Sequence, residues 1–197
     1  MATEQFSHSL LDADDSVLIV IDIQNAFLDK LPLQESERLL SRACWLIAVA
    51  QWRHIPVVVT AEEIHKQPLA PKIVQSLPAS APIFDKASFG LAHQPDILAA
   101  VEQTGCKTAV LIGLETDVCV AHSAIGLLGR GYRVAVVADA TGTPAPGQEI
   151  GLNRMRNAGT VIVSTKSLFY EWMRTVEMVS RFHRECPHMR GLAGFVL

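Results

Sequence analysis

Short apolar runs alternate with longer segments of helical period along most of the chain. Ser16–Ile21 and Pro56–Thr60 are apolar at successive positions, so both faces of each run are suited to burial, as in central strands of a parallel sheet. The same pattern in shorter or weaker form predicts four more strands, at Pro82–Asp85, Lys107–Ile112, Tyr132–Ala138 and Thr160–Val163.

Amphipathic segments lie between these runs. In Pro32–His54, residues such as Leu39, Ala43, Ile47 and Ala50 recur at helical spacing. Further helices are predicted at Lys72–Leu77, His93–Thr104, Asp117–Gly129, Gln148–Ala158 and Lys166–Val179. This alternation predicts a Rossmann-like α/β fold with three layers and a doubly wound six-stranded parallel sheet. We expect one domain over residues 1–197, with a core at about 15–175 and a C-terminal tail at 180–197.

Composition removes several classes of protein. The 197 residues can bury a large core without a disulfide or metal. The net charge is −3 without a basic cluster, which excludes a typical nucleic-acid partner. No apolar run approaches the ~20 residues that a membrane span needs. The N-terminus lacks a secretory signal and the four cysteines form no C-x-x-C pair, so we expect free thiols in the cytoplasm.

Polar residues follow the predicted strands at one edge of the sheet. Asp22 comes directly after the first strand, Lys86 after the third, and Cys119 begins the helix after the fourth. Ligands bind at the carboxyl ends of such strands, so convergence of these groups would indicate an enzyme. Asp22 is then a proton acceptor beside a thiol, although a carboxylate there can also cap a turn or pair with a distant arginine.

Cys119 has two interpretations. Free cysteines usually act as small buried hydrophobes, but the N–H groups at a helix start stabilise a thiolate that can attack a carbonyl. Lys86 would lower the proton affinity of the thiol further or hold Asp22, unless it is an ordinary solvated lysine. His122, three residues after Cys119, is an alternative base; without an orienting third group, a structural or interface histidine is favoured.

Three segments carry a resemblance to a known family. DIQNAF (22–27), DKASFG (85–90) and GLETDVCVAHSA (113–124) resemble the signature blocks of the isochorismatase-like cysteine hydrolases, and the similarity extends over roughly residues 15–175. The resemblance implies an Asp–Lys–Cys triad. In it Cys119 is the nucleophile, Asp22 the general base and Lys86 the electrostatic partner.

The same resemblance implies further details of the site. A cis peptide is expected at Leu114–Glu115, and the backbone N–H groups of Glu115 and Cys119 would form the oxyanion hole. Gln24, Phe27 and Phe89 match positions that line the substrate pocket, although ordinary core packing explains the two phenylalanines equally well. The implied reaction is hydrolysis of a small-molecule amide, carbamoyl or related C–N bond through a thioester on Cys119, without a cofactor.

The chain departs from two branches of this family. Nicotinamidases place a metal beside the site with an Asp-x-His pattern after the second strand. Here Glu62, Glu63 and His65 are capable ligands but that pattern is missing, so no metal is predicted. Isochorismatases proper lack the nucleophilic cysteine. The chain therefore resembles the metal-free branch of unassigned substrate, with a small-molecule substrate and a homo-oligomeric state expected. A metal-assisted amidase and a non-catalytic regulatory or scaffold protein remain the alternatives.

Overall fold

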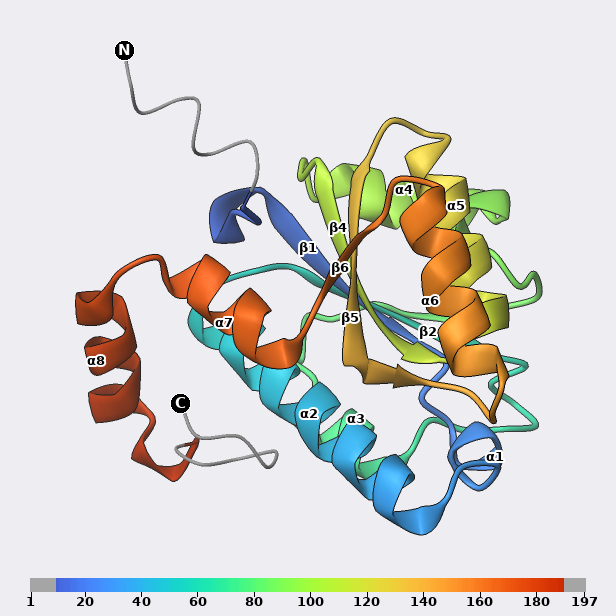
Figure 1. The fold of residues 1–197 in the computed structure, drawn as a ribbon, viewed down its shortest axis with the longest axis horizontal. Helices are drawn as coiled ribbons and strands as arrows, with labels where there is room; N and C mark the ends of the chain where they lie inside the picture. Colours follow the sequence, from blue (N-terminus) through green and yellow to red (C-terminus); the bar gives the residue numbers. More distant parts are fainter. Residues whose placement is uncertain (1–9, 190–197) are drawn as a thin grey trace.

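The computed structural model describes residues 10–189. The N-terminal residues examined for a secretory signal and residues 190–197 of the predicted tail lie outside the described residues. Figure 1 shows a twisted sheet with helices packed on both of its sides.

All six strands of the sheet are parallel, in the order β3-β2-β1-β4-β5-β6. The chain runs outward from the centre to one edge and then returns to build the other half. This order is that of a doubly wound α/β fold, as predicted, and its switch point lies between β1 and β4. The strands are β1 (Ser16–Ile21), β2 (Val57–Glu62), β3 (Ile83–Lys86), β4 (Thr108–Leu114), β5 (Arg133–Gly142) and β6 (Val161–Val163).

Helices cover both faces of the sheet and divide the core into two layers. In β1, Leu18 and Val20 pack into the layer under α2 and α7, whereas Val17, Ile19 and Ile21 pack into the layer under α4, α5 and α6. No helix among the described residues is both long and apolar enough to cross a membrane. The α-helices are α1 (Asn25–Leu28), α2 (Leu33–Trp52), α3 (Pro71–Ser76), α4 (Pro95–Gln103), α5 (Ala121–Leu128), α6 (Gly147–Asn157), α7 (Thr165–Met173) and α8 (Val176–Glu185).

The last predicted helix is wrong in one respect, because two helices occupy that stretch. Arg174 has a φ of 61°, a left-handed conformation that a helix cannot continue through. The Thr175 side chain then caps α8 by accepting a hydrogen bond from the N–H of Met178. Helix α8 covers part of the predicted tail, and Phe182 within it is fully buried.

Strand β4 continues two residues beyond its predicted end, to Leu114. Gly113, near this end, has a φ of 132°. A Cβ atom there would lie 1.9 Å from the carbonyl oxygen of Ile21 on β1, so only glycine fits. The close approach brings the end of β4 against the end of β1, where Asp22 follows.

Candidate active site

Asp22 lies at the carboxyl end of the central strand and is completely buried. Its φ of 50° is uncommon for a non-glycine residue and costs about 1–3 kcal/mol. The backbone N–H donates to the Thr60 carbonyl at 3.0 Å. One carboxylate oxygen accepts from the Thr60 hydroxyl at 2.8 Å, and the other lies 3.0 Å from Lys86 Nζ. The strained backbone therefore presents a carboxylate whose two oxygens both have partners.

Lys86 is the last residue of β3, and its side chain is also completely buried. Besides the contact with Asp22, Nζ donates to the Ser88 carbonyl at 2.8 Å and lies 3.7 Å from Cys119 Sγ. A buried ammonium is costly unless it is paired and hydrogen-bonded. The ion pair with Asp22 and the hydrogen bonds to Ser88 and Cys119 offset this cost.

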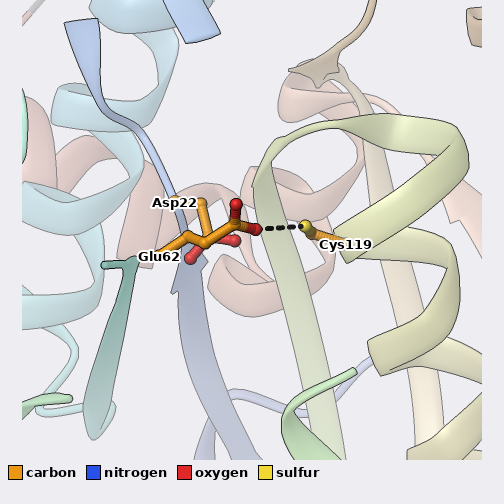
Figure 2. Close-up of side chains that lie close together, drawn as sticks. All are labelled: Asp22, Glu62 and Cys119. Carbon is orange, nitrogen blue, oxygen red and sulfur yellow. Dashed lines mark hydrogen bonds between the residues drawn. The ribbon is translucent and has the colours of Figure 1, made fainter. Parts of the chain in front are cut away.

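Cys119 belongs to a π-helical turn, Thr116–Val120, that leads into α5. Such turns frequently occur at functional sites. The preceding Leu114–Glu115 peptide bond is cis. Cys119 is 2% exposed, and its sulfur points toward the strand ends that carry Asp22 and Glu62 (Figure 2). The structure thus brings together the three residues that the sequence placed in a triad.

Burial has the largest effect on the proton affinity of the Cys119 thiol. Burial and the Asp22 carboxylate raise the pKa of Cys119 to about 12, and Lys86 opposes them only in part. Burial also raises the pKa of Asp22 above its usual value, against the effect of Lys86. The thiol is therefore neutral near pH 7, and an attack by Cys119 needs a neighbouring carboxylate to accept its proton.

Glu62 is a fourth member of the site. It is the last residue of β2 and the register partner of Lys86 on β3. Its Oε2 atom accepts a hydrogen bond from Cys119 Sγ at 3.6 Å, drawn as a dashed line in Figure 2, and lies 3.8 Å from Lys86 Nζ. The sequence interpretation considered Glu62 only as a metal ligand. Its position after a buried strand was the signal that could have placed it beside Asp22.

The residues considered for a metal separate into two groups. The ligand atoms of Asp22, Glu62 and Cys119 lie within 4.8 Å of one another. Glu63 pairs with Lys66 at 2.6 Å, and its side chain is half exposed. His65 is exposed. The Lys86 ammonium contacts all three candidate ligands, so it already supplies the positive charge that a metal ion would bring to this site.

The predicted pocket residues have different surroundings. Gln24 is fully buried; its side chain accepts from the Glu62 N–H at 2.8 Å and donates to the carbonyls of Glu62 and Gln67. Both amide hydrogens are thus used on the backbone, and Gln24 holds the end of β2. Phe27 is 8% exposed and packs in the core, whereas Phe89 is 55% exposed.

The alternative base, His122, does not join this group of contacts. It lies on α5, and its ring packs against Phe89 with the ring centroids 6.1 Å apart. The Cys119 sulfur instead contacts Glu62 and Lys86. The packing supports the structural role that the sequence favoured for His122.

Comparisons with known proteins agree with this fold. The family model for the isochorismatase domain matches residues 16–167, so the chain belongs to the isochorismatase family of hydrolases. It is 25% identical over 190 residues to the probable hydrolase YcaC of Escherichia coli, covering 92% of this chain and 91% of YcaC. The structure of that YcaC, described as an octameric hydrolase of unknown specificity, superposes with a TM-score of 0.80 at 24% identity, over 92% and 93% of the two chains.

Two other solved structures share the fold. The MAR1 ribonuclease from Caenorhabditis elegans has a TM-score of 0.82 at 22% identity and covers 92% of each chain. The N-carbamoylsarcosine amidase from Thermoplasma acidophilum has a TM-score of 0.65 at 24% identity, over 77% of this chain and 96% of the amidase. At these sequence identities, the two structures show that this chain has the same fold.

Proposed function

We propose that this protein is a cysteine hydrolase that cleaves an amide, carbamoyl or related C–N bond of a small molecule. The observation that carries the proposal is the buried contact of Lys86 with both Asp22 and Cys119, at 3.0 and 3.7 Å. Buried charges are costly to keep, and this pair lies beside a thiol at the edge of the sheet where such folds bind ligands. The name of the related N-carbamoylsarcosine amidase supports the same class of bond.

The first step forms a thioester. Asp22 accepts the Sγ proton of Cys119 as the sulfur attacks the carbonyl carbon, and the carbonyl electron pair moves to oxygen. The backbone N–H groups of Glu115 and Cys119 stabilise that oxyanion. When the tetrahedral intermediate collapses, the C–N bond breaks and the protonated Asp22 gives its proton to the departing nitrogen.

The second step hydrolyses the thioester and releases the acid product. Asp22, again ionised, takes a proton from a water molecule whose oxygen attacks the thioester carbon. The C–S bond breaks, and the proton returns from Asp22 to the Cys119 sulfur. Lys86 stays charged throughout; it orients Asp22 and stabilises the negative charge on the sulfur during attack.

The two alternatives have less support. A metal-assisted amidase would place a cation among Asp22, Glu62 and Cys119, where the Lys86 ammonium already lies in contact with all three. A non-catalytic scaffold has no need for a buried lysine–aspartate pair against a thiol, since well-packed apolar residues would serve stability equally well.

The proposal is tested by mass spectrometry of the protein incubated with a panel of small amides and carbamoyl compounds. A true substrate should leave an acyl adduct on Cys119 in rapid-quench samples. Cys119→Ala should abolish both the adduct and turnover. Cys106→Ala is the matched control, because Cys106 is buried in the same core layer but donates its S–H to the Ser16 carbonyl. Turnover retained by Cys119→Ala contradicts the mechanism.

We also infer a homo-oligomer in the cytoplasm. The octameric state named for YcaC supports an assembly of this chain. The cytoplasmic assignment rests on four unpaired cysteines, at positions 44, 106, 119 and 186.

A further inference from the structure

The charges of the active site do not balance. The buried Lys86 ammonium is paired with Asp22, and Glu62 adds a second carboxylate within 4 Å of both Lys86 Nζ and Cys119 Sγ. The thiol brings no compensating charge, because its pKa of about 12 keeps it protonated. The cluster of four side chains therefore carries one negative charge in excess.

Glu62 is the member of this cluster that faces solvent. Its side chain is 24% exposed, against 0% for Asp22 and Lys86 and 2% for Cys119. A molecule that approaches the sulfur from solvent therefore meets the Glu62 carboxylate, whose Oε2 lies 3.6 Å from Sγ.

The backbone that carries the Glu62 side chain is also held in place. The Gln24 side chain makes two hydrogen bonds of 2.8 Å to the backbone of Glu62. It accepts one from the Glu62 N–H and donates one to the Glu62 carbonyl. On the neighbouring strand, Lys86 is the register partner of Glu62. On this fixed backbone, Glu62 Oε2 lies near Lys86 Nζ and Cys119 Sγ, so the carboxylate needs little further ordering to interact with an incoming charge.

We propose that Glu62 selects substrates by charge: the site accepts neutral or cationic amides whose N–H groups donate to Glu62, and it rejects molecules with a carboxylate next to the scissile carbonyl. This inference rests on the proposed cysteine hydrolase function. At a separation of about 6 Å and an effective dielectric constant of about 40, between the values for a protein surface and for water, the repulsion between two carboxylates corresponds to roughly tenfold in rate.

The test uses two alkylating agents of nearly the same shape, neutral iodoacetamide and anionic iodoacetate. Their rates at Cys119 are measured by peptide mass spectrometry in the folded protein and in the chain unfolded in urea. In the unfolded chain the active site is lost, so the ratio of the two rates there is the intrinsic preference of a cysteine for iodoacetamide. In the folded wild type, that preference should be larger by about tenfold.

Three variants separate charge from shape. Glu62→Gln should lower the preference to near the intrinsic value, whereas Glu62→Asp, which keeps the charge, should retain most of it. Glu63→Gln is the matched control, because it removes the neighbouring carboxylate that pairs with Lys66; the preference should stay within about twofold of the wild type.

The outcomes distinguish this inference from the proposed function. Charge selection by Glu62 is overturned if the preference for iodoacetamide is equal in the wild type and in Glu62→Gln. If Asp22→Asn still slows the alkylation of Cys119 in that case, the proposed hydrolase function stands. If Asp22→Asn does not slow alkylation of Cys119 by iodoacetamide, the proposed nucleophile and base are contradicted, and charge selection with them.

Discussion

Two regions of this protein differ in the side chains that they bury: one is charged and polar, and the other is aromatic. The active site gathers Asp22, Lys86, Glu62 and Cys119 at the carboxyl ends of the strands. On the α2 side of the molecule, Trp45, Trp52, Phe169 and Phe182 from α2, α7 and α8 form an aromatic cluster, with ring centroids 5.1 to 6.3 Å apart. Even the polar atoms of the cluster are satisfied, since Trp45 Nε1 donates to the Met189 carbonyl and Trp52 Nε1 to Glu185.

The difference separates stability from reactivity. Burial of aromatic surface stabilises a fold in proportion to the area removed from water, with a further gain from edge-to-face geometry. Burial of a lysine and a carboxylate gives little or no net stability. Substitutions in the cluster should therefore lower the free energy of unfolding, whereas substitutions in the site should lower the rate of the reaction.

The largest effect is expected for Asp22→Asn, which removes the proton acceptor while keeping the shape of the side chain. General-base catalysis is worth 10²–10⁴-fold, so we expect kcat on the substrate found by adduct screening to fall about 10³-fold. Because the buried Lys86 loses its paired carboxylate, a loss of unfolding free energy is expected as well, and kcat is therefore measured per folded molecule.

The pH profile of the wild type sharpens this prediction. Because burial raises the pKa of Asp22, kcat/KM should rise with pH at a value above that of an ordinary aspartate. It should then stay level through pH 9, since the Cys119 thiol has a pKa of about 12. A step centred between pH 8 and 9, as for an unassisted thiolate, contradicts the assignment.

In the aromatic cluster, Phe182→Ala should cost about 4 kcal/mol of unfolding free energy, because it opens a cavity at a fully buried ring. Urea denaturation measures the loss, and the activity per folded molecule should remain close to that of the wild type. Val176→Ala on the same helix, 83% exposed, should change stability by less than about 0.5 kcal/mol. A similar loss in both variants would mean that α8 does not depend on the cluster.

A smaller, pH-dependent effect is expected for Lys86→Met. Removing one partner of a buried pair usually costs 3–5 kcal/mol. The cost is smaller here because Thr60 still donates to Asp22 and the Asp22 carboxylate can take up a proton. We therefore expect a loss of about 2 kcal/mol at pH 8.

The sign of the pH dependence follows from Asp22. Lys86 lowers the pKa of this carboxyl in the folded state, so its loss raises that pKa further above the unfolded value. The folded variant then binds more protons than the unfolded chain between these two values, and its stability falls as pH rises through that window. Urea denaturation at pH 4 and pH 8 should show the smaller loss at pH 4; equal losses contradict the coupling.

Much of the fold was predictable from local patterns. Strands such as Ser16–Ile21 are apolar on both faces, and their alternation with helices allows few topologies. The break between α7 and α8 was not predicted, because it depends on the left-handed backbone of one residue, Arg174, within a segment whose apolar period continues.

The site was predictable in part, for a similar reason. Asp22, Lys86 and Cys119 follow strands whose ends must meet at one edge, so their convergence could be inferred. Glu62 also follows a predicted strand, but its contact with Lys86 depends on the register between β2 and β3, which a single strand does not encode. The raised pKa of Cys119 depends on packing from several distant segments, and no local pattern reports it.

Gly113 has a consequence for how this protein can diversify. With 1.9 Å between its potential Cβ and the backbone of Ile21, this position admits no side chain unless the two central strands separate, and that would draw Asp22 away from the nucleophile. Changes of substrate can arise at Glu62 or at the exposed Phe89, neither of which takes part in this contact. Reaction chemistry and substrate choice are thus encoded in separate parts of the chain, and only the second is free to vary.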